Sequence, residues 1–228
     1  MNMKVIVYTA NINSYDNFNN LAVQDPNVRY ILFTDNKYYK SNVWEICHTD
    51  FIDKNLDSRR VARYLKTNPH KLLPNHDISI WIDYSNPPKF NDVSKMLREI
   101  NFSKSDIMCY KHDERNCIFA EANVVKKLKL DYPDVIDKQM KKYRNEGYPE
   151  NNGLFVTSFL IRKNNPTVNL FNEIWWDEIK NNSARDQLSQ VYSAWKCNLI
   201  IDNIKIDSSV YSNRFLHSKI PHPKRWTI

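Results

Sequence analysis

The stretch Ile78-Ser79-Ile80-Trp81-Ile82-Asp83-Tyr84-Ser85-Asn86 predicts the central strand of the fold. Its mainly apolar run stops at Asp83, with Asp77 before it and the Pro87-Pro88 pair after it. Such a run is typical of a strand buried on both faces of a parallel sheet. The strand then delivers the Asp83 carboxylate to the carboxyl edge of the sheet, where α/β proteins bind ligands. The alternative is that Asp83 is a turn or capping carboxylate, since strand ends are frequent turn sites.

A helix with a basic face is predicted just before this strand, over Asp57 to Lys66. Its apolar residues share one face, whereas Arg59, Arg63 and Lys66 recur at i, i+4 and i+7 on another. A cationic face beside an acidic strand end suits a phosphorylated ligand, held with or without a divalent ion. The alternative is a basic face that contacts only solvent.

Short apolar runs with polar exits alternate with helical patterns along the rest of the chain, which favours an α/β sheet over a β-sandwich. Gly147 stands where a left-handed residue would end a helix. Thr167 is expected to cap a later helix, and Ser183 to open a capping box with Asp186. Further strands are predicted at 4–10, 28–33, 43–47, 106–110, 154–162 and 198–202, and further helices at 90–100, 119–130 and 134–146. We expect one domain over residues 1–228.

Two glycines among 228 residues exclude glycine-rich phosphate loops, because neither a Walker loop nor a GxGxxG turn can be built from them. Phosphates would therefore be bound by side chains, helix N-termini or metal. The formal net charge of +7 and the pI near 9.1 favour anionic partners. No Lys/Arg block is dense enough to choose among sugar nucleotides, membrane surfaces and nucleic acid.

The chain start and the cysteines predict a soluble cytoplasmic protein. The first residues lead straight into a strand and lack a signal-peptide pattern, and no run approaches the length of a membrane span. Peripheral membrane contact stays open. Because no CxxC spacing occurs, reduced core thiols are expected at Cys47, Cys109, Cys117 and Cys197.

Five motifs taken together resemble a known family. They are Tyr8-Thr9-Ala10, Phe33-Thr34-Asp35-Asn36, Arg59 to Lys66 followed by Pro69-His70, Ser79-Ile80-Trp81-Ile82-Asp83, and Arg185-Asp186-Gln187-Leu188-Ser189. Their order and spacing resemble the glycosyltransferase-like family formerly catalogued as a domain of unknown function, found in plant wall-polysaccharide proteins and microbial glycan genes. The resemblance extends from about Lys4 to Trp195.

The resemblance implies a GT-A fold, a single Rossmann-like α/β domain with a mostly parallel sheet flanked by helices. It also implies a nucleoside-diphosphate sugar as donor and a glycan or glycolipid as acceptor. By the same resemblance the nucleotide lies against the exits of the first two strands, and the diphosphate lies near the basic helix. The donor-binding residues implied are Thr9, Ala10, Thr34, Asp35, Arg59, Arg63, Lys66, Asp83, Gln187 and Lys224.

Asp83 is similar in position to the first aspartate of the GT-A Asp-x-Asp metal motif. The third position is Ser85, so a clamp of two carboxylates is not present locally. Mn²⁺ or Mg²⁺ dependence is therefore left open, since a hard cation prefers several oxygen ligands. A distant similarity to glycogenin-like transferases would let His217 complete a metal site with Asp83 and let Lys224 reach a phosphate. The alternative is that both are surface residues of the tail.

Sugar transfer also needs a carboxylate near the anomeric carbon, as base or as charge stabiliser. The candidates are Asp186, which the resemblance places at the site, Asp113, which follows a strand together with His112, and Glu121. Asp186 and Glu121 have an ordinary alternative, because each lies near the start of a predicted helix, where a carboxylate compensates the helix dipole. His70 is expected to be structural.

Three classes of function are compatible with these patterns. The first is a glycosyltransferase of the hexosyltransferase class, with a polysaccharide, capsule, cell-surface or viral glycan as acceptor. The second is a non-catalytic sugar-nucleotide or glycan-binding module of the same fold. A nucleic-acid-binding module fits the charge but lacks a recognisable motif, so no nucleic-acid partner is expected. Trp175, Trp176 and Trp195 are expected in the core, as their helical spacing suggests.

Overall fold

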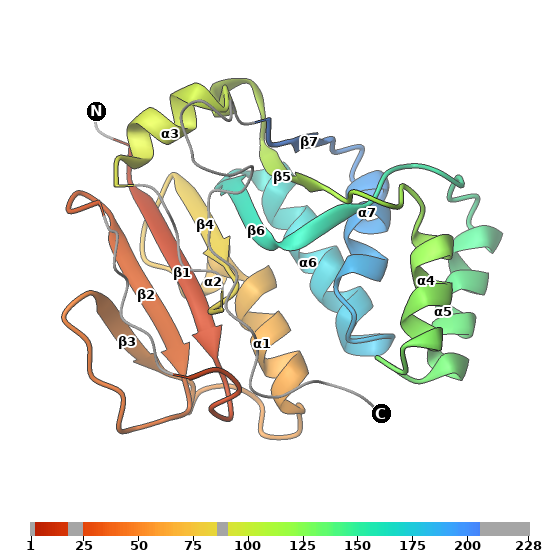
Figure 1. Cartoon of the computed structure of the whole chain (residues 1–228), viewed down its shortest axis with the longest axis horizontal. Helices are drawn as coiled ribbons and strands as arrows, with labels where there is room; N and C mark the ends of the chain where they lie inside the picture. Colours follow the sequence, from red (N-terminus) through yellow and green to blue (C-terminus); the bar gives the residue numbers. More distant parts are fainter. Residues whose placement is uncertain (1–2, 18–24, 86–90, 206–228) are drawn as a thin grey trace.

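The computed structural model describes residues 3–17, 25–85 and 91–205, which share one mixed sheet (Figure 1). The strand order is β3-β2-β1-β4-β6-β5-β7. The strands are β1 Val5–Asn11, β2 Arg29–Thr34, β3 Trp44–His48, β4 Ile78–Ile82, β5 Ile107–Lys111, β6 Phe155–Lys163 and β7 Ile201–Asn203. The described residues form a single α/β domain, and its extension over all of residues 1–228 stays a prediction.

The sheet is mostly parallel, as predicted. In β4, Ile80 pairs in parallel with Val7 of β1 and antiparallel with Ile161 of β6. Among the described strands only β6 runs against the others, since β5 is antiparallel to it and β7 is parallel to β5. All five residues of β4 are buried, as expected of a central strand. The ends of β1, β2, β3 and β4 therefore meet at one edge of the sheet.

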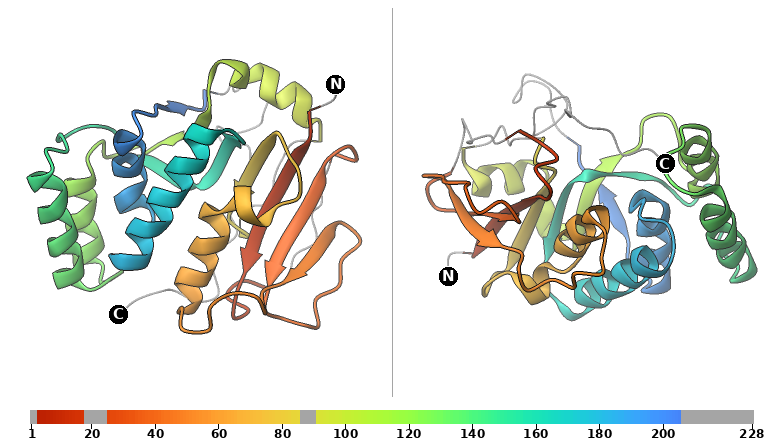
Figure 2. Two further views of the ribbon diagram at one scale, coloured as in Figure 1. Left: turned by 180° about the vertical axis from the view of Figure 1, so that it is seen from behind. Right: turned by 90° about the horizontal axis from the view of Figure 1, so that it is seen from below.

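Helices cover both faces of this sheet (Figure 2). They are α1 Ser58–Thr67, α2 Pro69–Leu72, α3 Val93–Glu99, α4 Ile118–Lys127, α5 Pro133–Asn145, α6 Pro166–Asn181 and α7 Gln187–Lys196, with a 3-10 turn at Phe102–Lys104. Successive strand residues point to opposite faces. Val7 packs in the core that contains Met96 of α3, whereas Tyr8 packs in the core that contains Trp175 of α6. The larger core lies under α1 and α4 to α7.

Two predicted helix caps are wrong. Asn165, not Thr167, caps α6, because its side chain accepts the Val168 N–H at 3.0 Å. Pro166 then occupies the first helical position, where its missing N–H costs nothing. The last helix begins later than predicted, since Asp186 is its N-cap and Ser183 lies before it. The left-handed conformation predicted for Gly147 is confirmed by its φ of 80°.

Other predictions about the interior are confirmed. Trp175 is fully buried, and Trp176 and Trp195 pack against the same core. All four cysteines are free thiols, of which Cys109 and Cys117 are buried and Cys47 and Cys197 are half-buried.

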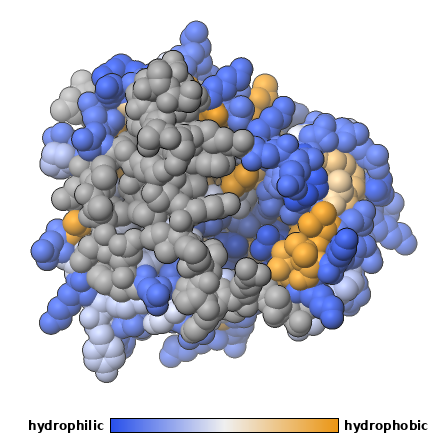
Figure 3. Space-filling model, viewed as in Figure 1, coloured by the Kyte–Doolittle hydropathy of each residue, from blue (hydrophilic) through white to orange (hydrophobic). Residues whose placement is uncertain are grey.

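None of the described helices has the length and apolar character needed to cross a bilayer. On the face shown in Figure 3, hydrophilic residues cover most of the described surface, with apolar residues in a few patches.

Candidate active site

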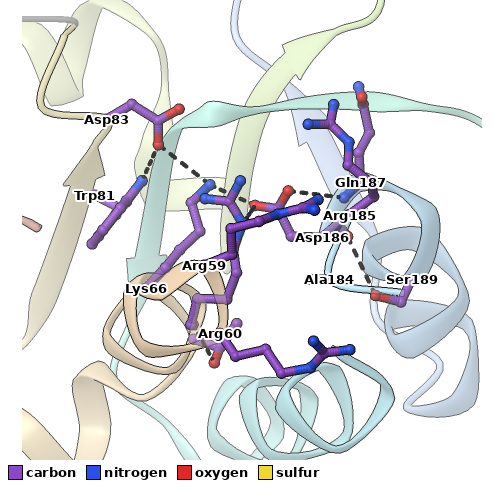
Figure 4. Close-up of polar contacts among 12 residues, drawn as sticks. Arg59, Arg60, Lys66, Trp81, Asp83, Ala184, Arg185, Asp186, Gln187 and Ser189 are labelled. Atoms are coloured by element: carbon purple, nitrogen blue, oxygen red, sulfur yellow. Dashed lines mark hydrogen bonds and ion pairs between the residues drawn. The ribbon is translucent and has the colours of Figure 1, made fainter. Parts of the chain in front are cut away.

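Lys66 is the centre of an ion network built from three separate elements. Its side chain is 0% exposed at the end of α1. Its Nζ lies 2.6 Å from Oδ2 of Asp186 and 3.4 Å from Oδ1 of Asp83 (Figure 4). A buried ammonium requires such partners, because removing it from water is costly. Lys66 therefore joins the end of β4 to the start of α7.

Asp83 lies at the edge of the sheet where the sequence predicts it. Its N–H donates to the carbonyl of Ser158 at 2.8 Å, which continues the β4–β6 pairing by one residue. Its Oδ1 accepts the indole N–H of Trp81 at 2.8 Å. The side chain is 30% exposed, so this carboxylate is the part of the Lys66 network that solvent reaches most easily.

Asp186 lies at the interior end of the same network. Its side chain is 4% exposed, and its Oδ2 lies 3.4 Å from Nε of Arg63. Burial alone would raise the pKa of this carboxyl, but the charges of Arg63 and Lys66 and the Lys66 hydrogen bond outweigh it and hold the pKa well below its usual range. Asp186 is therefore an anion at neutral pH, and it is poorly suited to accept a proton.

The basic face of α1 is turned inward, so the interpretation as a solvated face is wrong. The side chains of Arg59 and Arg63 are 13% and 20% exposed. Arg59 donates to the carbonyl of Leu130 at 3.0 Å and lies 3.8 Å from Asp131. Asp131 in turn accepts the hydroxyl of Ser183 at 2.7 Å. Arg59 thus holds the connection between α4 and α5, and Asp131 of this connection in turn holds Ser183 before α7, in addition to any role of Arg59 with a ligand.

Arg60, which the sequence analysis did not single out, connects α1 to the end of α6. Its guanidinium donates to the carbonyls of Ile179 at 3.3 Å and Asn182 at 2.7 Å, at the end of α6. Its Nη1 also pairs with Asp57 at 2.7 Å. The helical spacing placed Arg60 off the predicted ligand face, and no local pattern shows which loop it contacts.

Arg185 is a second residue that sequence reasoning missed as a binding group. Within the described residues its guanidinium has no carboxylate at ion-pair distance, and its Nε is buried without a hydrogen-bond partner. It is close enough to Asp186 to help lower the pKa of that carboxyl. Burial lowers the pKa of Arg59, Asp131 raises it, and repulsion from the charges of Arg63 and Arg185 lowers it further. The network therefore holds more positive than negative charge.

The residues predicted to contact the nucleotide lie in the last residues of β1 and β2, except for Asp35, which follows β2. Thr9 and Thr34 are fully buried, and the Thr34 hydroxyl donates to the carbonyl of Asn11 at 2.8 Å. Ala10 is half-buried beside them. Asp35 is exposed and accepts the N–H of Asn13 at 2.9 Å. In this conformation Asp35 presents a side chain to solvent and the two threonines do not. Their roles with a nucleotide stay predictions.

Gln187 connects α7 to β6. Its Nε2 donates to the carbonyl of Phe155 at 2.8 Å, and its N–H donates to Oδ1 of Asp186 at 3.2 Å. Figure 4 shows Gln187 and Arg185 extending from the start of α7 in the same direction. The structure therefore brings the predicted residues Arg63, Lys66 and Asp83 together with this turn.

The other two predicted carboxylates belong to a separate cluster at the end of β5. Glu121 is buried, and its Oε2 accepts Nε of Arg115 at 2.6 Å. Arg115 Nη2 lies 3.1 Å from Nε2 of His112, and burial, followed by the charge of Arg115, lowers the pKa of His112. Asp113 is exposed in the loop between them. The catalytic roles proposed for Glu121 and Asp113 stay predictions.

The described residues contain no group of three His, Cys, Asp or Glu side chains that could hold a metal ion. Asp83 offers one partly exposed carboxylate, and Lys66 already lies beside its Oδ1. His217 and Lys224 lie outside the described residues. The metal site at Asp83 and His217 and the phosphate contact of Lys224 therefore stay predictions.

Comparison with known proteins gives the family. Residues 31–217 match the sequence model of the family described as TOD1/MUCI70, glycosyltransferase-like domain. This chain belongs to that family. The match to the TOD1/MUCI70 family includes α1, β4 and the turn before α7, and therefore Lys66, Asp83 and Asp186. The resemblance stated from the five motifs is confirmed.

A curated relative and a solved structure are also similar. The chain is 27% identical over 141 residues to the probable hexosyltransferase MUCI70 of Arabidopsis thaliana, which covers 58% of this chain. That match spans about a quarter of the relative, 24% of its length. The crystal structure of mouse xyloside xylosyltransferase 1 in its apo form superposes with a TM-score of 0.48 at 8% identity, covering 89% of this chain and 85% of the other.

Proposed function

We propose that this member of the TOD1/MUCI70 family transfers a sugar from a nucleoside-diphosphate donor to a glycan or glycolipid acceptor. The observation that carries the proposal is the charge of the network at the carboxyl edge of the sheet. Arg63, Lys66 and Arg185 supply three cations there, against the carboxylates of Asp83 and Asp186. Family membership and the relative described as a probable hexosyltransferase support the reaction class.

The proposed reaction breaks the bond between the anomeric carbon and the diphosphate, so negative charge develops on the leaving phosphate. Fixed cations in a dry site stabilise this charge more effectively than water does. Lys66 is held in place from two sides, and its position needs no rearrangement during the reaction. Arg185 has no ion pair in the described residues and is therefore the guanidinium that we assign to the donor phosphates.

The carboxylates take different roles in this proposal. Asp186 holds the side chains of Lys66 and Arg63 in place, because it is buried beside both of them. The base for the acceptor hydroxyl is assigned to Asp113, which is exposed, because Glu121 is buried and paired with Arg115. A divalent ion, if bound, would add charge at the diphosphate. Asp83 would supply one of its oxygen ligands, and the donor or residues beyond the described ranges would supply the others.

The test is a thermal-shift screen of nucleoside-diphosphate sugars, with UDP-glucose, UDP-galactose, UDP-xylose and GDP-mannose as probes, each with and without Mn²⁺. A ligand that binds the native state raises its melting temperature, so one selective increase would identify the donor class. Dependence of that increase on Mn²⁺ would support the metal site. No increase with any donor, and no release of nucleoside diphosphate, would contradict the proposal.

A non-catalytic binding module of the same fold is the second candidate. It is favoured by one observation, the ion pairing of buried Asp186, which leaves this carboxylate poorly suited to accept a proton. The two functions separate by donor hydrolysis in the protein that binds the donor. Binding without any release of nucleoside diphosphate, across a panel of glycan acceptors, favours the binding module.

A further inference from the structure

Arg162 of β6 is a buried cation that the proposed chemistry does not use. Arg162 is fully buried, with 0% of its surface exposed. In the described part of the chain its hydrogen-bond partners are neutral: the side chain of Asn172, the hydroxyl of Tyr8 and the carbonyl of Lys66. Burying a guanidinium without a carboxylate is costly, so its hydrogen bonds to these neutral partners must offset the hydration that it loses.

The three partners show what Arg162 holds. Its Nη2 donates to the carbonyl of Lys66 at 2.7 Å, and the hydroxyl of Tyr8 donates to the same oxygen at 2.7 Å. This carbonyl lies in the last turn of α1, where backbone oxygens have no partner within the helix. A cation is also favourable at this end of a helix because of the helix dipole. Arg162 and Tyr8 therefore fix the end of α1.

A second contact fixes the guanidinium itself. Its Nη1 donates to Oδ1 of Asn172 on α6 at 2.6 Å, so Arg162 cannot follow a movement of α1 without losing this bond. Arg162 thus connects β6 and α6 to the backbone of Lys66. The side chain of the same Lys66 carries the ammonium between Asp83 and Asp186.

We infer that Arg162, together with Tyr8, is a positioning residue that places the Lys66 ammonium in the candidate active site. The inference rests on the proposed function for its consequence, namely weaker binding of the donor diphosphate when Lys66 is displaced. The placement of Lys66 by Arg162 and Tyr8 is independent of that function, since the position of Lys66 can be observed without a donor.

The experiment follows the Lys66 ammonium by NMR in protein labelled with ¹⁵N-lysine. A fully buried ammonium with a 2.6 Å partner exchanges its hydrogens slowly and gives a distinct Nζ signal, which Lys66→Arg assigns by deleting it. Arg162→Met removes one of the two donors to the Lys66 carbonyl, and Tyr8→Phe removes the other while keeping the ring. Tyr143→Phe is the matched control, because it also removes a buried hydroxyl but lies in a different network.

We expect Arg162→Met and Tyr8→Phe to shift or broaden the Lys66 signal and Tyr143→Phe to leave it unchanged. UDP, used as a probe of diphosphate binding, should bind about tenfold more weakly to Tyr8→Phe than to wild type. If Arg162→Met fails to fold, Tyr8→Phe alone decides. An unchanged Lys66 signal in folded Tyr8→Phe would overturn the inference. If the Lys66 signal shifts in Tyr8→Phe but wild type does not bind UDP, the result would contradict the proposed function and leave the inference standing.

Discussion

Two buried polar networks in this domain differ in how completely their charges are compensated. In the network around Glu178, between α5, α6 and α7, the carboxylate is paired with Lys142 and accepts the hydroxyl of Tyr143 and the amide of Asn182. Each charge there has a partner of opposite sign. In the network around Lys66, three cations, namely Arg63, Lys66 and Arg185, face two carboxylates, Asp83 and Asp186. The nearby Arg162 guanidinium adds a further positive charge, and its hydrogen-bond partners among the described residues are neutral.

This difference separates a structural network from a candidate binding site. A compensated network between helices gains nothing from a ligand, and it stabilises helix packing, as the stacked rings of Tyr143 and Tyr192 at 3.7 Å indicate. A network with excess positive charge at the carboxyl edge of a sheet would be stabilised by an anion. The comparison predicts that substitutions in the Lys66 network affect donor binding, whereas substitutions in the Glu178 network affect stability alone.

The largest effect is expected for Lys66→Met. The change leaves Asp186 buried with less compensation, so the free energy of unfolding should fall by about 3–5 kcal/mol, and donor binding should be lost. Chemical denaturation and the thermal-shift assay measure the two effects. In the other network, Lys142→Met leaves the Glu178 carboxylate, which is 5% exposed, without its cation, so stability should also fall, but donor binding should stay at the wild-type level. Loss of donor binding in both variants would remove the distinction.

Asp186→Asn should lower the free energy of unfolding less than Lys66→Met does, and it should change how that free energy depends on pH. Asparagine can still cap α7 but cannot compensate Lys66 and Arg63. Because the folded-state pKa of Asp186 is depressed, its contribution to stability is complete above the unfolded-state pKa of about 3.9 and is lost as pH falls below it. Urea denaturation between pH 7 and pH 3 should therefore show a steeper acid loss in wild type than in Asp186→Asn. Parallel pH profiles would contradict this account.

Arg185→Gln should separate binding from stability. Since Arg185 has no ion pair in the described residues, its removal should change the free energy of unfolding by no more than about 0.5 kcal/mol. Donor affinity, measured by calorimetry, should fall about tenfold, because a charge-assisted hydrogen bond to phosphate is lost. Arg59→Gln is the control with the opposite profile, since Arg59 holds Leu130 and Asp131. Full affinity in Arg185→Gln would exclude it from the donor site.

The smallest effect is expected for Tyr143→Phe. Its hydroxyl bonds Glu178 at 2.8 Å and Gln139 at 2.8 Å, so its loss should cost about 1 kcal/mol of stability. Donor affinity should stay at the wild-type value. A reduced affinity in this variant would show that the two networks are coupled, and the comparison would then fail.

The local parts of this structure could be predicted from the sequence. The apolar run at β4, the basic repeat of α1 and the turn before α7 are patterns with the period of a strand or a helix, and that period is set by backbone geometry. The predicted N-caps of α6 and α7 were wrong because several neighbouring polar residues could each accept the first N–H groups of the helix. The difference between Asn165 and Thr167 depends on where Pro166 sits.

The residue pattern alone shows that cations recur on one face of α1 and that a carboxylate ends β4. Packing of the elements sets the rest: this face points inward, Lys66 meets a carboxylate 120 residues away in Asp186, and Arg162 holds the end of the helix. The physical reason is that a helical period fixes which side chains share a face but not what that face contacts. Ion pairs across the core form only when α1, β4, β6 and α7 pack together.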